Sequence, residues 1–378
     1  MSFNDIRPYS DEELNQELNT LINDPEFEPI LSYIFKDENI VKQVKAQLGT
    51  MNNVRDFQLN FMYPLVKQII AESTDGVTCS GIENLQKDKA YIFISNHRDI
   101  ILDSAFMNGL MFQEDLNTTE IAIGSNLLIF DWITRLVRIN RAFIVKRNIP
   151  VKQQLLASRE LSQYIRHVIT EKGESIWIAQ REGRSKDGND ATQPALLKML
   201  NMSNCKSKDF VEGFKELCLV PLAISYEIEP CGNEKVVELL NRSENTEFKK
   251  TPKDDLLAMS EGLKNAKGRV HFAFGKPITT ELEQVAESGK LNDQLAGLAS
   301  LVDQQIHTNY KLWPTNYIAY DILNNTDKYS QEYTPEQKEK FIQVTNERLE
   351  ILGERKEAGK GLWMNMYANP VINKENAN

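Results

Sequence analysis

The sequence predicts an α/β fold in which a largely parallel sheet is covered by helices on both faces, with an N-terminal helical subdomain and a helical C-terminal extension. Three observations support this class. Short β-branched and aromatic runs recur along the middle of the chain, segments of helical periodicity separate them, and both ends carry helical periodicity alone. Strands that alternate with helices form parallel sheets that are covered on both faces. We place the boundaries of the three parts at 1–80, 81–312 and 313–378.

Residues 1–80 have the apolar spacing of amphipathic helices. Ser10 precedes the acidic segment Asp11–Glu13, an arrangement that favours a helix start. Apolar side chains then recur every three or four residues through Ile22, and similar patterns occupy 40–48 and 57–70. Because no polar cluster repeats in this part, we predict a small helical subdomain or cap whose side chains serve packing.

The middle of the chain contains the runs that we predict as strands. Gly76 to Gly81 breaks the preceding helical pattern, and strands then alternate with helices at 100–112, 127–137 and 151–170. From Thr280 the pattern is helical again, and Pro314 interrupts it before further helices to about residue 360. The predicted strands are Tyr91–Ile94, Ile121–Ile123, Ala142–Val145, Ser175–Ala179, Cys218–Tyr226 and Val270–Phe274.

Composition and charge limit the class of protein. Hydrophobic residues make up 41% and charged residues 26% of 378 residues, as in ordinary globular proteins. A net charge of −10 argues against nucleic acid as the main partner. The chain shows no metal-ligand spacing, since its four histidines are scattered and no Cys-x-x-Cys pair occurs among Cys79, Cys205, Cys218 and Cys231.

The same sequence features indicate a location. No apolar stretch approaches the roughly 20 residues that cross a bilayer, and the segment Met1–Asp5 does not open a signal peptide. Cysteines without an evident pairing pattern are typical of a reducing compartment. We therefore expect a cytoplasmic protein that is soluble or peripheral at the inner face of the membrane.

A run of polar residues, Ser95–Asp99, directly follows the predicted strand Tyr91–Ile94, and a helical pattern starts at Ile100. Open α/β sheets build their sites outside the carboxyl ends of strands. His97 has two carboxylates, Asp99 and Asp103, within one or two helical turns. A carboxylate that binds one ring nitrogen leaves the other free to act as a general base. The alternative is that Asp99 only caps the following helix.

Basic residues follow two other predicted strands. Lys146 and Arg147 come directly after Ala142–Val145, and Arg181 and Arg184 follow Ser175–Ala179. Guanidinium groups match the geometry of phosphate, and Gly183 would let the backbone approach an anion closely. Most charge runs are solvated loops. The position of these residues after buried strands favours an anion site.

Four of these segments resemble motifs of the glycerolphosphate acyltransferase family, which joins glycerol-3-phosphate acyltransferase with 1-acylglycerol-3-phosphate acyltransferase. Asn96-His97 with a nearby carboxylate resembles the first motif, and Ala142–Arg147 the second. Glu182–Ser185 resembles the third, and Val220-Pro221 the fourth. The resemblance covers roughly residues 77–280.

Two departures from the family pattern leave alternatives open. Five residues separate His97 from Asp103 instead of four, and Leu102 occupies the position of the family aspartate. Asp99 and Asp103 are therefore both candidates for the carboxylate that orients His97, and we favour Asp103. The third motif is one residue short, so that Glu182 or Arg181 could take the place of the family glutamate.

The resemblance implies an O-acyltransferase of phospholipid biosynthesis. It would move a fatty acyl group from acyl-CoA or acyl-ACP to a hydroxyl of glycerol-3-phosphate or 1-acylglycerol-3-phosphate (lysophosphatidate), without a metal or cofactor. His97 would be the general base, oriented by Asp103 or Asp99. The residues that would bind the acceptor are Arg147, Lys146, Glu182, Gly183, Arg184, Ser185 and Arg181.

A fatty acyl substrate also implies an apolar groove and contact with a membrane surface. The segments 127–136 and 363–367 are candidates for this contact, with ordinary core packing as the alternative for both. Two other functions compete with the leading one. The acceptor could be another lysolipid or an acylated amino acid, or the chain could be a non-catalytic protein that binds lipid or an acyl carrier. The altered spacing after His97 keeps the last of these in contention.

Overall fold

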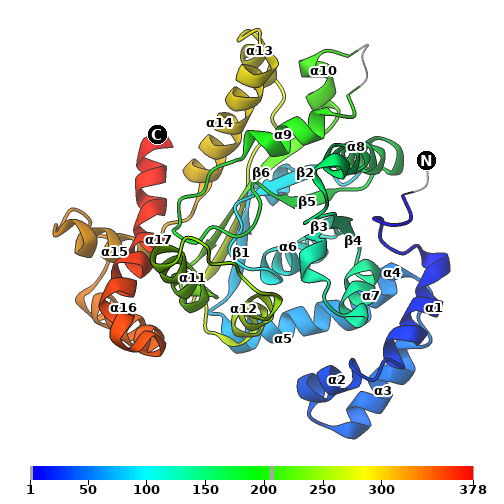
Figure 1. Cartoon of the computed structure of the whole chain (residues 1–378), viewed down its shortest axis with the longest axis horizontal. Coiled ribbons are helices and arrows are strands. Elements are labelled where there is room, and N and C mark those ends of the chain that lie inside the picture. Colours follow the sequence, from blue (N-terminus) through cyan, green and yellow to red (C-terminus); the bar gives the residue numbers. More distant parts are fainter. Residues whose placement is uncertain (1–2, 205–207, 378) are drawn as a thin grey trace.

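The predicted α/β class is confirmed by the computed structural model, which describes residues 3–204 and 208–377. Met1, Ser2 and Cys205 lie outside the described residues. The centre of the molecule is a seven-stranded sheet of order β1-β7-β6-β2-β5-β3-β4 (Figure 1). Its strands are β1 (Val77–Ser80), β2 (Ile92–Ser95), β3 (Glu120–Gly124), β4 (Ala142–Val145), β5 (Ile176–Ala179), β6 (Leu219–Tyr226) and β7 (Val270–Phe274).

The sheet is largely parallel, as predicted. Only β6 and β7 pair antiparallel among the described strands, and β2 lies between β5 and β6 with parallel pairing on both sides. All four residues of β2 are buried, as expected for a central strand in such a sheet. Because β6, β2, β5, β3 and β4 run in one direction, the segments that follow them leave the sheet along one edge.

Helices cover both faces of the sheet, and the side chains of β2 alternate between two cores. Ile92 and Ile94 belong to one core, with side chains from α8 (Val151–His167), α9 (Pro194–Asn201), α10 (Phe210–Lys215) and α14 (Leu291–Asn309). Phe93 belongs to the core on the other face, with α5 (Tyr63–Ser73) and α6 (Leu102–Gln113). Figure 1 shows the first set of helices above the sheet and the second below it.

The N-terminal part is helical up to Ser73. It contains α1 (Asp11–Ile22), α2 (Glu28–Phe35), α3 (Glu38–Leu48) and α4 (Val54–Phe57), and a π-helical turn (Gln58–Met62) joins α4 to α5. These helices share a core with Ile139 at the end of α7 (Asp131–Ile139). Gly76 to Gly81, where the sequence predicts a break in the helical pattern, contains β1, an edge strand paired with β7.

The C-terminal helices α15 (Pro314–Asn324), α16 (Pro335–Leu349) and α17 (Lys356–Ala377) pack with α11 (Gly232–Glu244) around the fully buried Trp363. Met364, Met366 and Tyr367 are buried there too, so these side chains belong to a core and offer no surface to a membrane. The remaining α-helices of the described chain are α12 (Pro252–Lys264) and α13 (Glu281–Ala286). No helix of the described chain has both the length and the hydrophobicity that a bilayer crossing needs.

Candidate active site

A cavity of about 1830 Å³ opens where β2, β3, β4 and β5 end, and it brings most of the predicted site residues together. Asp99, Asp103 and Ser185 do not reach its surface and lie behind it. Seven of the ten predicted residues line it: His97, Lys146, Arg147, Arg181, Glu182, Gly183 and Arg184. The ends of these parallel strands thus bring the seven residues to one cavity, and the roles given to them stay predictions.

The backbone before His97 is fixed by the neighbouring strand. Asn96 donates a hydrogen bond from its side-chain amide to the carbonyl of Ile224 (2.9 Å) and accepts one from the Ile224 N–H (2.7 Å). The Asn96 side chain is fully buried in this position. It thus ties the end of β2 to β6 and sets the direction in which the chain leaves the sheet.

Asp103, in the first turn of α6, is the carboxylate that contacts the imidazole. Its Oδ2 lies 2.8 Å from His97 Nδ1 and also accepts hydrogen bonds from the backbone N–H groups of Arg98 (2.6 Å) and Asp99 (3.1 Å). Its Oδ1 accepts a hydrogen bond from the Tyr226 hydroxyl (2.9 Å). Burial raises the pKa of Tyr226 well above its ordinary value, so the phenol keeps its proton and remains a donor.

The imidazole of His97 is held in one orientation. Because a carboxylate only accepts, the proton at this contact sits on Nδ1, and Nε2 carries the lone pair. Within residues 3–204 and 208–377, no group forms a hydrogen bond to Nε2. Trp177 of β5 packs edge-on against the ring, with centroids 5.4 Å apart and planes at 71°. The His97 side chain is 13% exposed and lines the cavity.

Asp99 has a different set of partners. Its Oδ1 accepts hydrogen bonds from the backbone N–H groups of Ile101 (2.9 Å) and Leu102 (2.8 Å) at the start of α6. Its Oδ2 accepts one from the thiol of Cys231 (3.1 Å). Burial raises the pKa of Cys231 well above its ordinary value, which keeps the thiol protonated as a donor. Asp99 thus holds the turn that leads into α6, whose N-cap residue is Ile101, and it does not contact His97 through its side chain.

A buried ionic network anchors the loop after His97. The guanidinium of Arg98 pairs with Asp190 (2.5 Å) and Glu229 (3.2 Å), and Glu229 pairs with Lys235 (2.6 Å). Burial opposes the charge on Arg98, but its pKa is raised overall because Asp190 and Glu229 lie beside it. Removing one partner of such a network leaves an uncompensated buried charge. The network therefore fixes the His97 loop to the segments that follow β5 and β6.

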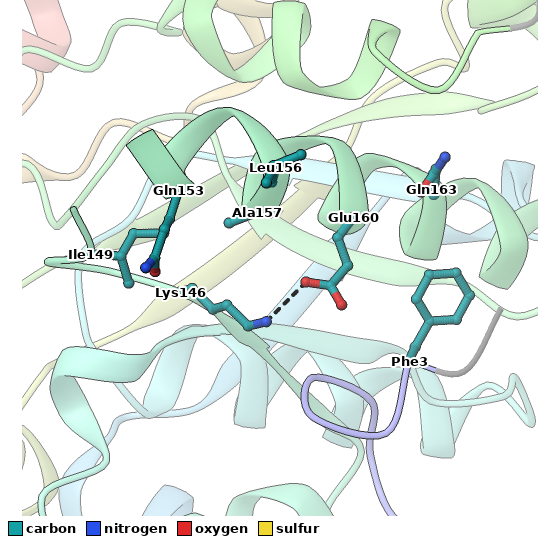
Figure 2. A pocket seen from close by; sticks show the side chains of 8 residues that line it. All are labelled: Phe3, Lys146, Ile149, Gln153, Leu156, Ala157, Glu160 and Gln163. Atoms are coloured by element: carbon teal, nitrogen blue, oxygen red, sulfur yellow. Dashed lines mark hydrogen bonds and ion pairs between the residues drawn. The ribbon is translucent and has the colours of Figure 1, made fainter. Parts of the chain in front are cut away.

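The two basic residues after β4 differ in their surroundings. Arg147 pairs with Glu182 across the cavity wall (2.9 Å), and its backbone N–H donates a hydrogen bond to Ser125 Oγ (2.9 Å). Lys146 also borders a second cavity of about 490 Å³, shown in Figure 2. There its ammonium contacts Glu160 (2.9 Å) and Asp5 (2.9 Å), which raise its pKa. Two carboxylates already balance Lys146, which makes it a weaker anion ligand than Arg147.

The loop after β5 places a buried cation at the cavity. Gly183 has a φ of +71°, a left-handed conformation that turns the chain between Glu182 and Arg184. The Ser185 N–H donates a hydrogen bond to the carbonyl of His97 (3.0 Å), which fastens this loop to the His97 loop. Arg184 is 7% exposed, and its Nη1 has no hydrogen-bond partner in the described part of the chain.

An apolar wall forms the other side of the cavity. Side chains of α6 and α7 contribute to it, so the segment 127–136 lines the cavity while Trp132 and Leu136 also pack in the N-terminal core. Helices α2, α5 and α12 and the π-helical turn complete it. Its apolar members include Ile34, Met62, Val66, Ile101, Ala105, Phe112, Leu127, Phe130, Trp132, Ile133, Leu136, Leu256 and Met259.

Comparison with known proteins identifies the central part of the chain. Residues 76–217 match the family model Acyltransferase. This segment is an acyltransferase domain. The match confirms the family resemblance drawn from the motifs and the expectation that the protein is an acyltransferase enzyme. It includes His97, Asp103, Arg147 and Arg184, whereas Val220-Pro221 lies beyond it, inside β6.

The other comparisons give little further detail. No curated protein matches the sequence. Among solved structures, the acyltransferase is similar to the 1-acyl-sn-glycerophosphate (LPA) acyltransferase PlsC from Thermotoga maritima, with 13% sequence identity and a TM-score of 0.37. That likeness covers 75% of this chain and 92% of the other. Among the described residues, no group of three or more His, Cys, Asp or Glu side chains could hold a metal ion.

Proposed function

We propose that this acyltransferase moves a fatty acyl group from an acyl thioester, acyl-CoA or acyl-ACP, to a hydroxyl of glycerol-3-phosphate or 1-acylglycerol-3-phosphate. One observation carries the proposal. The Nε2 of His97, left with a lone pair by the contact of Nδ1 with Asp103, borders a cavity that has arginines on one side and an apolar wall on the other. Such a cavity suits an acceptor with a phosphate and a donor with a long alkyl chain.

In the proposed reaction, His97 Nε2 takes the proton of the acceptor hydroxyl as the hydroxyl oxygen attacks the thioester carbonyl. The new C–O bond forms, the C–S bond breaks, and the departing thiolate receives the proton from the imidazolium. General-base help of this kind contributes about 10²–10⁴-fold in rate. Asp103 keeps the imidazole in the required tautomer and stabilises its cationic form.

The acceptor phosphate would be held by the cations of the loops after β4 and β5. Arg147, Arg181 and Arg184 all line the cavity that contains His97. Glu182 orients Arg147 through their ion pair, and Gly183 and Ser185 shape the loop between them and His97. Lys146 is a secondary candidate because two carboxylates already contact it. Fixing the phosphate places the hydroxyl next to the base, which is an orientation effect.

The apolar wall would hold the acyl chain, and the chain would enter from a membrane surface. This part of the proposal is supported by the run of apolar residues of α6 and α7 along the cavity that His97 borders. Removing an alkyl chain from water stabilises binding by about 0.8 kcal/mol per buried CH₂. The site would therefore distinguish long-chain donors from short ones.

The test is release of free thiol from palmitoyl-CoA and palmitoyl-ACP, with glycerol-3-phosphate, lysophosphatidate, other lysophospholipids or an acyl amino acid as acceptor. We expect release that depends on glycerol-3-phosphate or lysophosphatidate. Release with only another lysolipid or an acyl amino acid would change the acceptor, and no release with any combination would favour a binding protein.

The variant His97→Ala should reduce this release by at least about 10²-fold. The matched control is His167→Ala on α8, because His167 also contacts a carboxylate, Glu171 (2.8 Å), but does not line the cavity. We expect the control to retain wild-type activity. Equal activity of the two variants would remove His97 from the mechanism.

A further inference from the structure

Tyr226 is a buried residue beside the candidate base, and the proposed reaction gives it no role. It is the last residue of β6, is 1% exposed and does not line the cavity. Its hydroxyl donates a hydrogen bond to Oδ1 of Asp103 (2.9 Å) and forms no other hydrogen bond with the described residues. Because Tyr226 is absent from the cavity wall, its effect on a bound substrate has to pass through Asp103.

The two oxygens of Asp103 have different donors. Oδ2 faces Nδ1 of His97 and the backbone N–H groups of Arg98 and Asp99. Oδ1 faces the Tyr226 hydroxyl, which is its one donor within the described chain. The Asp103 side chain is fully buried, so bulk water does not reach Oδ1. Without this hydroxyl, an oxygen of a buried carboxylate would have no donor, which is costly.

The phenol therefore acts on Asp103 in two ways. It fixes the rotation of the carboxylate, because Oδ2 can turn away from His97 only if the bond to Oδ1 breaks. It also stabilises the negative charge of the carboxylate, which limits how strongly Asp103 favours a proton on the imidazole. The phenol stays a donor because burial, and then the nearby carboxylates of Asp103 and Asp99, raise the pKa of Tyr226 well above its ordinary value.

We propose that Tyr226 is a positioning residue for the acyl transfer, whose hydroxyl holds Asp103 in the rotamer that contacts His97 and so keeps the imidazole ready to accept a proton on Nε2. This inference rests on the proposed function and goes beyond it, because it adds a residue of β6 that lies outside the matched segment 76–217.

Other charged groups surround His97 and Asp103, and they stay in place when only the hydroxyl is removed. They are Arg98 and Asp99 of the same loop, Glu229 after β6, and the cavity residues Arg147, Arg181, Glu182 and Arg184 of the loops after β4 and β5. The difference between wild type and Tyr226→Phe therefore isolates the effect of the phenol on the pair.

The first measurement is the titration of His97, which needs no turnover. The imidazole signals of the full chain are followed by NMR against pH, and the spectrum of His97→Gln assigns them among the four histidines. We expect the His97 signals of Tyr226→Phe to titrate at a higher pH than those of the wild type, because a carboxylate with one donor fewer stabilises the imidazolium more strongly.

The matched control is Tyr164→Phe on α8. Tyr164 is also buried and also donates to a buried carboxylate, that of Glu120, but it does not line the cavity and does not contact Asp103. This variant loses a comparable hydrogen bond, so it measures what a structural effect alone does. We expect it to leave the His97 titration unchanged.

The second measurement is thiol release from palmitoyl-CoA, at a pH where the rate no longer depends on pH. We expect Tyr226→Phe to lower kcat about tenfold, the size of one lost hydrogen bond to a charged group. The KM values should not change, because Tyr226 is absent from the cavity wall. In the background of Asp103→Asn the same substitution should lower kcat no further, since its effect passes through Asp103.

An unshifted His97 titration, or a rise in KM in place of the fall in kcat, would overturn the proposal. If Tyr226→Phe does not fold, ortho-fluorotyrosine takes the place of Tyr226. Its more acidic phenol is a stronger donor, so the His97 signals should then titrate at a lower pH than in the wild type. A wild type that releases no thiol contradicts the proposed function, and the His97 titration still decides this inference.

Discussion

At the scale of single residues, the structure separates two carboxylates that the sequence had left as alternatives. Asp99 accepts hydrogen bonds from the N–H groups of Ile101 and Leu102, which fixes the turn between His97 and α6. Helix α6 then starts at Leu102, and Asp103 falls in its first turn with four donors around it. Asp103, although five residues separate it from His97, contacts the imidazole.

We expect Asp103→Asn to lower kcat by about 10²–10⁴-fold, because an amide cannot stabilise the imidazolium and favours the wrong tautomer. Asp99→Asn should keep the bonds to the two backbone N–H groups, because asparagine accepts them as well as aspartate does. It should lower the unfolding free energy by about 1 kcal/mol, because the hydrogen bond from the Cys231 thiol is lost. Thiol-release kinetics and urea unfolding of both variants check the two expectations. A larger fall in kcat for the Asp99 variant than for the Asp103 variant would mean that Asp99, and not Asp103, supports His97 in catalysis.

The position of some candidate site residues follows from a local rule that can be read from the sequence. His97, Arg147 and Arg184 each come just after a buried strand, and the parallel topology brings such segments together. Tyr226 and Cys231 were missed because their bonds to Asp103 and Asp99 span 123 and 132 residues. No local pattern in the sequence indicates which strand end or helix start will supply such a partner.

At the scale of elements, the strands were predictable because buried runs of β-branched and aromatic residues leave few alternatives. The exception is β1, whose residues are alternately half-buried and exposed and include Thr78, Cys79 and Ser80. The helix expected from Leu127 begins instead at Asp131, because Ser125–Leu127 forms a separate 3₁₀ turn. Apolar periodicity cannot distinguish such a turn from the first turn of a helix.

Helix α12 packs against the His97 loop through Gly262. A Cβ at this position would lie 2.1 Å from Asp99 Oδ2 and 3.2 Å from Cys231 Sγ. Replacing glycine by alanine inside a helix normally gains up to about 1 kcal/mol. Here the overlap with buried atoms costs about 1–3 kcal/mol, so we expect Gly262→Ala to be destabilising overall. Urea unfolding measures the change.

The matched control is Gly361→Ala in α17, where nothing lies within 4 Å of the added Cβ apart from the chain neighbours and the backbone of the helix itself. Only the higher helix propensity of alanine affects stability at that position, so the variant should be at least as stable as the wild type. A gain in stability for Gly262→Ala, equal to the gain of the control, would mean that α12 does not pack closely on the loop.

The connection between α12 and β7 carries a buried lysine with a pH-dependent effect. Lys267 donates hydrogen bonds to Ser73 Oγ (2.8 Å) and the carbonyl of Asn265 (2.6 Å). Burial lowers its pKa from 10.5 to about 8. Between these values the unfolded chain binds more protons than the folded one, so this group makes the protein more stable as pH rises from 8 to 10.5.

We therefore expect Lys267→Met to lack this rise in stability, whose slope is at most about 1.4 kcal/mol per pH unit. Urea unfolding at pH values below and above the lowered pKa should show the wild type gaining on the variant at the higher pH. Lys253→Met, at an exposed position of α12, serves as the control and should leave the slope unchanged. Parallel stabilities of wild type and Lys267→Met at both pH values would show that the folded lysine titrates normally.

At the scale of the whole molecule, the cavity is built from parts that are distant in the sequence. The acyltransferase domain supplies His97 and the loops after β4 and β5, while α2, α5 and α12 close the cavity from outside the core of that domain. The chain has a net charge of −10, yet cations gather at this cavity from three separate segments. Composition alone could not show this distribution, because it depends on how the chain folds back on itself.

Helix α6 runs along the apolar wall, and one of its faces lines the cavity that contains His97. Ala105, Asn108 and Phe112 line the cavity at helical spacing, and together with the N-cap residue Ile101 they cover a rise of about 16 Å. If an acyl chain lies along this face, a large side chain at Ala105 should shorten the space available to it. We expect Ala105→Trp to lower the ratio of kcat/KM for palmitoyl-CoA to that for octanoyl-CoA by tenfold or more, because about 0.8 kcal/mol is lost per CH₂ excluded.

Ala71→Trp, at an exposed position on α5, is the control and should keep the wild-type ratio. An unchanged ratio in a folded, active Ala105→Trp enzyme would mean that the acyl chain does not lie along this face of α6, because the added indole would then not contact the substrate.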